Sequence, residues 1–439
     1  AEDVLARLLP RPKQLVRSAG SLVLGPQVVL RAGGADAEAK LFAHQLEVEH
    51  GLKLGAGERA GPGIQLRLRP EGGSPQGYRL EVDPDGIVVS GSAQGIHYGL
   101  QTLLDLLYRE GGALRAPCCA IEDEPDIALR GMLLLPAGKD WDLTVRRFAA
   151  GVMARLKLNA LMLHFAPAAV RFDVPIEGVE PAEDAVAEGR LREMARLLKT
   201  VHIEIVPGYG GPRVLCPASQ KAEARVASQL LGRLADIFGP RWVNVGYDEM
   251  GHFSAACPCC RSKPNHEVFV QAVSFLHGVL KEHGTVAAIW NDMLFRTEGD
   301  PLGWLDDRQW AVEHLPRDLV LNDYEYDPST VEYSRLGWWK EAGFEQVTGS
   351  PWSTEENVLH YARSVRKFGC LGLLGTSWGE GPSPTGVGHA EGIVWTAAYG
   401  WRVGEPPIAD AQAQVVRRAQ WIASRAWERL PVDPAGCLR

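Results

Sequence analysis

From residue 127 onward, short apolar runs alternate with longer segments whose apolar positions recur every three to four residues. Runs of the first kind are typical of buried strands, and the second spacing is typical of amphipathic helices. Eight strand–helix units follow one another over about 275 residues, the size of a (β/α)8 barrel. The predicted strands are residues 128–135, 160–165, 203–207, 242–246, 285–290, 319–324, 345–349 and 370–378. The predicted helices are 144–156, 191–199, 221–238, 268–283, 331–339, 356–368 and 390–403.

A doubly wound parallel sheet is the competing arrangement of such units. It usually carries a Gly-rich phosphate turn after its first strand, and residues 130–136 lack one. The pattern therefore favours the α/β class in the form of a TIM barrel.

The segment before the barrel has a different rhythm. Strand-like alternation covers residues 22–31, 64–68 and 78–90, and helical spacing covers residues 35–50 and 95–108. Strands with two helices on one face predict a small α+β domain. We therefore expect three parts: an N-terminal α+β domain over 1–125, the catalytic barrel over 126–405, and a C-terminal helix with a tail over 406–439.

Charge and hydropathy exclude several classes of function. The 439 residues include 46 Lys and Arg against 54 Asp and Glu, so the formal net charge is −8. This balance disfavours nucleic acid or an anionic membrane as the main partner. The apolar runs are too short to span a bilayer. The first residues show no apolar leader, so we expect either a cytoplasmic protein or an exported one whose signal has been removed.

The candidate chemistry lies where the predicted strands end. In a barrel of this kind the catalytic groups come from the carboxyl ends of the strands. Strand four ends in Asp248 and Glu249, and three other strands end at Trp290, Trp352 and Trp378. Aromatic rings stack on the C–H faces of sugars, and carboxylates bind sugar hydroxyls. Two adjacent carboxylates point to different sides and can do different work on one substrate. The sequence therefore predicts a carbohydrate site.

The chain resembles the glycoside hydrolase family 20 β-N-acetylhexosaminidases over nearly its whole length. The strand ending in Asp248-Glu249 is similar to the family's His-x-Gly-Gly-Asp-Glu motif, and Trp378-Gly379-Glu380 is similar to its closing Trp-x-Glu. The other matching segments are GYRLEVDPDGIVVSGSAQGIHYGLQTLLDLL (77–107), IEDEPDIALRG (121–131), and Lys157-Leu158-Asn159 followed by His164.

This resemblance implies an exo-acting β-N-acetylhexosaminidase that works by substrate-assisted retention and needs no cofactor for catalysis. Its substrates would be glycans or glycoconjugates with terminal β-linked N-acetylglucosamine or N-acetylgalactosamine. Glu249 would be the general acid and base, and Asp248 would hold the acetamido N–H. Tyr324, with Tyr326 as second choice, would steady the acetamido oxygen. The remaining implied substrate-binding residues are Arg130, His164, Trp290, Trp352, Trp378 and Glu380.

Some positions depart from the family pattern. Asn244 stands where the motif has His, Tyr247 stands where it has its second Gly, and residues 207–213 lack the usual His. The Asp–His pair that supports the acid in the family is therefore missing or rebuilt. Two alternatives stay open: a non-catalytic carbohydrate-binding protein, and a barrel hydrolase of the O-linked N-acetylglucosamine type, which uses two aspartates.

A cysteine cluster follows the carboxylate pair. Cys257 and Cys260 have the Cys-x-x-Cys spacing of zinc sites, and Cys216 comes from the preceding loop. We expect these three to hold a structural zinc if one is present, with His252 or His266 as a fourth ligand. Free thiols and a local disulfide are the alternatives.

Overall fold

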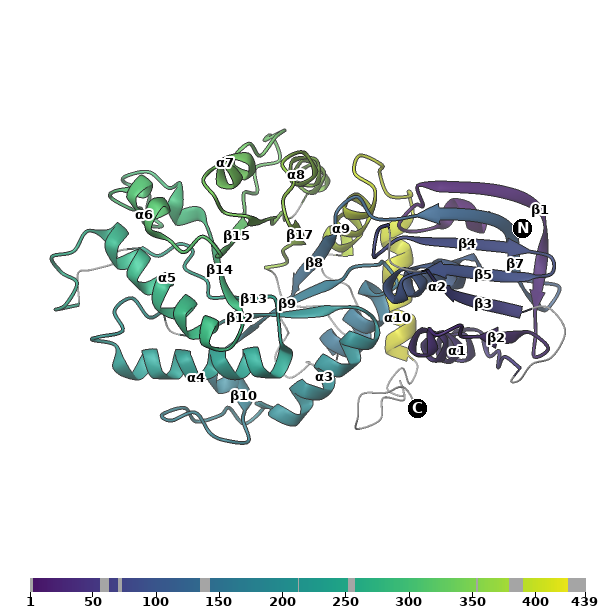
Figure 1. The fold of residues 1–439 in the computed structure, drawn as a ribbon, viewed down its shortest axis with the longest axis horizontal. Coiled ribbons are helices and arrows are strands. Elements are labelled where there is room, and N and C mark those ends of the chain that lie inside the picture. Colours follow the sequence, from purple (N-terminus) through teal and green to yellow (C-terminus); the bar gives the residue numbers. More distant parts are fainter. Residues whose placement is uncertain are drawn as a thin grey trace.

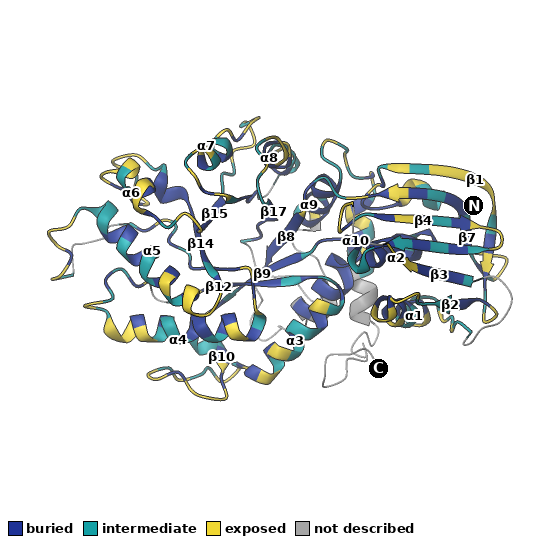
Figure 2. Ribbon diagram, in the orientation of Figure 1, coloured by how far each residue is buried: buried dark blue, intermediate teal, exposed yellow. Residues whose placement is uncertain are grey.

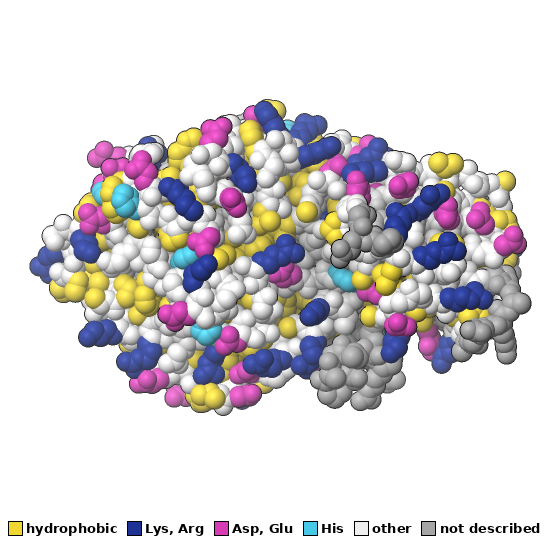
Figure 3. Space-filling model, in the orientation of Figure 1, with side chains coloured by type: hydrophobic (Ala, Val, Ile, Leu, Met, Phe, Trp, Pro, Cys, Tyr) yellow, Lys and Arg dark blue, Asp and Glu magenta, His cyan; other side chains and the backbone are white. Residues whose placement is uncertain are grey.

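The computed structural model describes residues 3–55, 63–69, 73–134, 143–211, 213–251, 257–352, 354–378 and 390–424. Two units lie side by side along the long axis of the molecule: an N-terminal sheet with its helices, and a closed barrel (Figure 1). On the face drawn in Figure 3, basic and acidic side chains are interspersed, in keeping with the modest net charge.

The N-terminal unit is a seven-stranded sheet in the order β1-β7-β4-β5-β3-β2, with β6 paired to β7. Burial alternates along β4 and β5, which leaves one face to pack on helix α2. The strands are β1 (Gln14–Leu24), β2 (Val29–Arg31), β3 (Gly63–Leu68), β4 (Tyr78–Asp83), β5 (Gly86–Gly91), β6 (Tyr108–Glu110) and β7 (Ala113–Asp123), and the helices are η1 (Val4–Arg7), α1 (Asp36–His50) and α2 (Ala93–Leu106).

Two long strands of this sheet were missed by the sequence pattern: β7 completely, and β1 over residues 14–21. Residues 113–123 contain alanines, cysteines and Pro117, which have little intrinsic strand preference. They form β7 because β1 and β4 pair with them on either side. Pairing with neighbouring strands therefore makes residues 113–123 a strand, although their local strand preference is low.

The barrel closes in the order β12-β13-β14-β15-β16-β17-β8-β9 with all pairs parallel, so the predicted TIM barrel is confirmed. Its strands are buried and its helices expose one face each (Figure 2). The strands are β8 (Leu129–Leu134), β9 (Ala160–Phe165), β12 (Glu204–Tyr209), β13 (Trp242–Asn244), β14 (Val286–Trp290), β15 (Val320–Asp323), β16 (Gln346–Gly349) and β17 (Gly372–Gly375).

The helices around the barrel follow the predicted ranges closely. One of them, Leu143–Met153 (η2), is a π-helix. Helix α6 (Arg308–His314) was not predicted, because seven residues show little periodicity. None of the described helices is both long and apolar enough to cross a membrane. The helices are α3 (Glu188–Thr200), α4 (Lys221–Phe238), α5 (Asn265–Glu282), α6 (Arg308–His314), α7 (Arg335–Glu341), α8 (Glu355–Lys367), α9 (Ala390–Trp401) and α10 (Ala411–Ser424). Short pieces between them are η3 (Pro167–Ala169), β10 (Val170–Arg171), β11 (Val186–Ala187) and η4 (Asp292–Leu294).

A buried ionic network joins the two units. Glu49 of α1 accepts hydrogen bonds from Arg155, which follows η2, at 2.6 and 2.7 Å, and from Arg418 of α10 at 3.0 Å. Burial alone would raise the pKa of the Glu49 carboxyl, but the two guanidinium groups outweigh it and lower the pKa to about 2. The carboxylate thus ties α1, α10 and the barrel together.

We expect Glu49→Gln to destabilise the protein by about 3 kcal/mol at pH 7, because it leaves buried cationic groups without their counter-charge. A depressed carboxyl pKa stabilises the fold above the unfolded pKa, and that contribution is lost as pH falls toward the folded value near 2. Denaturant unfolding measures the difference in unfolding free energy between wild type and Glu49→Gln. This difference should be smaller at pH 3.5 than at pH 7 by about 1 kcal/mol.

The matched control is Glu47→Gln on the same helix, whose carboxylate is half-exposed and pairs with Lys53. Its effect should stay below about 1 kcal/mol. If Glu49→Gln lowered the free energy of unfolding equally at pH 7 and pH 3.5, the ionic role given to Glu49 would be contradicted.

Candidate active site

Asp248 and Glu249 project from a sharp turn directly after β13. Gly246, Tyr247 and Glu249 all have left-handed backbone conformations, with φ of 79°, 66° and 47°. Such conformations are costly for non-glycine residues and cluster at functional sites. The buried Tyr247 hydroxyl anchors the turn by donating to the carbonyls of Val214 and Ala272. The turn is therefore held from two neighbouring elements.

Each of the two carboxylates faces its own cationic group. Arg213, in the loop after β12, places a guanidinium nitrogen 3.6 Å from Asp248 Oδ1. Arg296 lies 3.6 Å from Glu249 Oε1, and the Tyr324 hydroxyl donates to the same oxygen at 3.4 Å. The Glu249 side chain is 46% exposed, which leaves it open to a ligand.

Asp292 holds both the Glu249 backbone and the Arg296 side chain through hydrogen bonds. Its Oδ2 accepts the backbone N–H of Glu249 at 3.1 Å and Arg296 Nε–H at 2.6 Å. Burial raises the Asp292 pKa to about 6, although Arg296 opposes the rise. Its other oxygen is buried and has no hydrogen-bond partner within the described ranges.

Asp292 was placed at the end of the fifth strand from the sequence, but neither it nor Arg296 was assigned a role. The available signal was an acid directly after the fifth barrel strand with an arginine four residues later, the spacing of an ion pair on a helical turn. This acid–arginine pair lies beside Glu249 and contacts its backbone N–H and its side chain.

The predicted aromatic residues form a continuous wall. Trp290 contacts Tyr324 and Trp378 with ring centroids 5.8 and 5.5 Å apart. Tyr326 lies 5.4 Å from Tyr324 and 5.3 Å from Trp352, and accepts a hydrogen bond from Trp378 Nε1 at 2.7 Å. Five residues from four strand ends thus come together.

The Tyr324 hydroxyl of this wall reaches Glu249, and the Tyr326 hydroxyl accepts hydrogen bonds from Trp378 and Thr376. Burial, together with the negative charges of Asp248 and Glu249, raises the pKa of Tyr326 to about 12. The same causes, with Asp292 added, raise the Tyr324 pKa well above its ordinary value. Both hydroxyls therefore stay protonated at neutral pH and can donate hydrogen bonds.

His164 reaches the same region from β9. Its ring lies 6.2 Å from that of Trp378, and burial lowers its pKa to about 4, so it is neutral at pH 7. Gly208 on the neighbouring strand makes room for it, since a Cβ there would stand 2.0 Å from the imidazole. Its Nε2 is buried and unpartnered in the part of the chain that the structure describes.

Arg130 does not join these residues, and its interpretation as a substrate-binding residue is wrong. It is the second residue of β8, near the end of the barrel opposite to the carboxyl ends of the strands. Its buried guanidinium donates to the Lys157 carbonyl at 2.7 Å, to Gln76 Oε1 at 2.8 Å and to the Tyr98 hydroxyl at 3.3 Å. It serves the contact between the two units. Glu380 lies outside the described residues.

Behind the aromatic wall lies a buried carboxylate that was not predicted from the sequence. Asp323, the last residue of β15, accepts hydrogen bonds from Asn291, Arg335, Trp339 and Tyr361 at 2.9 to 3.1 Å. It is completely buried. These bonds fix the strand end from which Tyr324 and Tyr326 emerge.

The N-terminal unit matches a known family, and the chain has a curated relative. Residues 6–124 match the family described as glycosyl hydrolase family 20, domain 2. The chain is 23% identical over 423 residues to a β-hexosaminidase of Porphyromonas gingivalis, covering 77% of this chain and 53% of the relative. It therefore spans about half the length of that curated relative.

Solved structures share the fold. A family 20 exo-β-N-acetylglucosaminidase from Vibrio harveyi has a TM-score of 0.71 at 15% identity, covering 96% of this chain and 77% of that one. A Flavobacterium johnsoniae chitobiase has a TM-score of 0.70 at 17% identity over 95% and 72% of the two chains. A Streptomyces plicatus β-hexosaminidase mutant has 0.66 at 17% identity over 96% and 95%. The resemblance drawn from the sequence is confirmed.

We expect Asp323→Asn to lower the free energy of unfolding by about 3 kcal/mol, because it leaves buried donors and the Arg335 guanidinium without their shared charge. Denaturant unfolding at pH 7 measures this loss. The control is Asp184→Asn, an exposed aspartate, which should change stability by less than about 0.5 kcal/mol. Equal stability of the two variants would contradict a supporting role for Asp323.

Proposed function

We propose that this chain, a relative of the glycoside hydrolase family 20 proteins, hydrolyses terminal β-linked N-acetylhexosaminides from the non-reducing end. The observation that carries the proposal is the grouping of Asp248, Glu249 and two protonated tyrosines against an indole wall. Leaving group and acetamido group are neighbours on one sugar ring, so adjacent carboxylates suit their separate needs.

In this proposal Glu249 protonates the glycosidic oxygen as it leaves. The acetamido oxygen of the substrate forms a bond to the anomeric carbon while the glycosidic bond breaks, which gives an oxazolinium ion. Asp248 accepts the acetamido N–H and balances the developing positive charge, and Tyr324 or Tyr326 donates to the acetamido oxygen. Water then attacks the anomeric carbon, Glu249 takes its proton, and the acetamide is restored.

The surrounding residues hold Glu249 in place and shape the pocket around it. Arg296 lies within 3.6 Å of Glu249, and Asp292 holds both Arg296 and the Glu249 backbone. Trp290, Trp352 and Trp378 offer apolar faces for the sugar ring and the acetamide methyl. His164 supplies a neutral ring nitrogen that is free for a hydroxyl in the described structure.

The central test compares wild type with Glu249→Gln on a disaccharide of N-acetylglucosamine and on 4-nitrophenyl N-acetyl-β-glucosaminide. Loss of a general acid lowers kcat/KM by about 10²- to 10⁴-fold. We expect the larger loss on the disaccharide, since nitrophenolate leaves without needing a proton. 4-Nitrophenyl β-glucoside, which lacks the N-acyl arm, should be at least about 100-fold slower than its N-acetyl counterpart in the wild type.

Glu298→Gln is the matched control, because Glu298 is exposed, carries the same charge and lies in the loop that follows η4. It should keep wild-type rates. Equal rates for wild type and Glu249→Gln would remove Glu249 from the reaction. Binding of N-acetylglucosamine without turnover of any hexosaminide would instead identify a carbohydrate-binding protein, and preference for O-linked N-acetylglucosamine on peptides would identify the other hydrolase class.

A separate expectation concerns pH. With a pKa raised to about 6, Asp292 is protonated below that pH and charged above it. Only the charged form makes an ion pair with Arg296, so kcat/KM should rise as pH increases through about 6. Asp292→Asn should lower kcat/KM by about tenfold and remove this acidic limb. An acidic limb that survives unchanged in the variant would contradict a positioning role for Asp292.

A further inference from the structure

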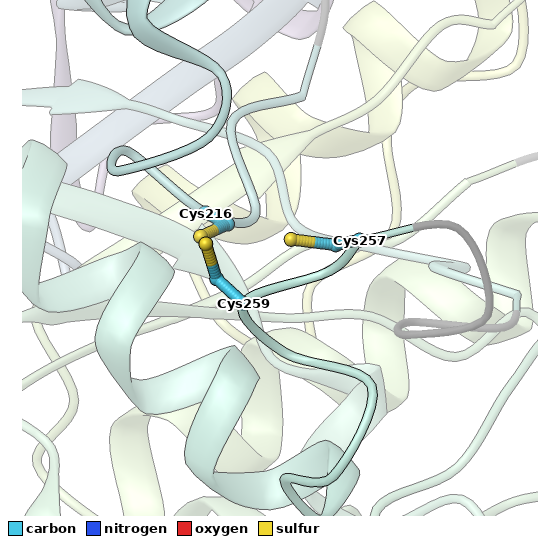
Figure 4. A group of neighbouring side chains, drawn as sticks. All are labelled: Cys216, Cys257 and Cys259. Carbon is cyan, nitrogen blue, oxygen red and sulfur yellow. The ribbon is translucent and has the colours of Figure 1, made fainter.

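Two loops beside the acid pair bring four cysteines together. Cys216 lies between β12 and α4, and Cys257, Cys259 and Cys260 lie between β13 and α5. The Sγ atoms of the first three are all within 4.8 Å of one another. Figure 4 shows the sulfurs of Cys216 and Cys259 next to each other and the Cys257 side chain pointing toward them. Cys260 is buried and follows Cys259 directly in the chain.

We propose that this cluster binds one zinc ion, with Cys216, Cys257 and Cys259 as ligands and Cys260 completing a tetrahedral set. Thiolates are the ligands that zinc prefers in structural sites. Sulfurs bound to zinc at about 2.3 Å stand about 3.8 Å apart. The Sγ atoms of Cys216, Cys257 and Cys259, all within 4.8 Å of one another, therefore need only a small contraction. The group of mutually close ligand atoms contains Cys259 in place of the expected Cys260, and the proposal assigns Cys260 to the fourth position.

The two histidines considered from the sequence are not needed. His266 Nδ1 accepts the backbone N–H of Asp307 at 3.1 Å, and its ring lies against Trp310. His252 lies outside the described residues. An all-sulfur site is therefore the arrangement that the described side chains favour.

Local backbone structure prepares the cluster. Tight turns begin at Cys216 and Cys257, where the backbone N–H groups of Gln220 and Arg261 donate to the respective carbonyls. The Gln220 side chain accepts the backbone N–H of Cys216 at 2.9 Å. Burial is graded from the buried Cys216 to the exposed Cys259, which gives an ion a route from solvent.

A metal here would join the loop that carries Arg213 to the loop that carries Asp248, whose side chains lie 3.6 Å apart. Its role would be structural, since the proposed hydrolysis needs no metal. The proposal concerns metal content alone, so its failure would leave the proposed hydrolase activity untouched.

The test measures metal in the full chain, purified without reductant or added zinc. Elemental analysis should find about one equivalent of zinc in the wild type and less than about one fifth in Cys216→Ser and Cys259→Ser. Cys370→Ser is the control, because Cys370 precedes β17 at the other end of the barrel, and it should keep the full equivalent.

A second measurement does not depend on the folding of the variants. Titration of wild type with a mercurial thiol reagent should release the zinc to a chromogenic chelator, and cobalt(II) in its place should show the intense bands of tetrahedral thiolate ligation. A disulfide between any two of the four cysteines in the purified protein, or free thiols with less than about one tenth of an equivalent of zinc, would overturn the proposal.

Discussion

Closure of eight parallel strands into one barrel is the constraint from which the site follows. In a parallel barrel every carboxyl end lies on the same rim, so residues that are distant in the chain become neighbours. Five residues from five different strand ends form one chain of contacts: His164 with Trp378, Trp378 with Trp290, Trp290 with Tyr324, and Tyr324 with Glu249. Without closure, β8 and β17 would not pair, and the rim would open beside Trp378.

The acid pair is subject to a second constraint, which is electrostatic. Two adjacent carboxylates repel each other, and a third, Asp292, lies below them in a poorly solvated position. The molecule compensates with Arg213 on one side and Arg296 on the other. Behind the acid pair, a buried aspartate and an arginine hold the backbone and side chain of Glu249.

The N-terminal unit contributes rigidity from the opposite end of the barrel. Arg130 and Lys157, both fully buried, meet Tyr98, Tyr78 and Trp401 across the contact between the units. Lys157 lies 3.6 Å from the buried Asp123 of β7. Buried charges of this kind are tolerated only when they are paired and hydrogen-bonded. The two units therefore share one set of satisfied polar groups and have little freedom to slide.

The order of residues along the chain was enough to specify the strand–helix alternation, the barrel and most of the rim. A buried parallel strand appears as an apolar run, and the residue that ends the run stands on the rim whatever its neighbours are. Asp248, Glu249 and the aromatic residues could therefore be named from position alone.

Three features depended on how the elements pack: the side of the barrel on which Arg130 lies, the pairing that makes residues 113–123 a strand, and the placing of Asp292, Arg296 and Asp323 behind the site. A local pattern records which positions are buried along one element. The partner of a buried charge usually comes from a different element, and which element lies next to it depends on the packing of the whole fold. No periodic pattern in the sequence therefore identifies that partner.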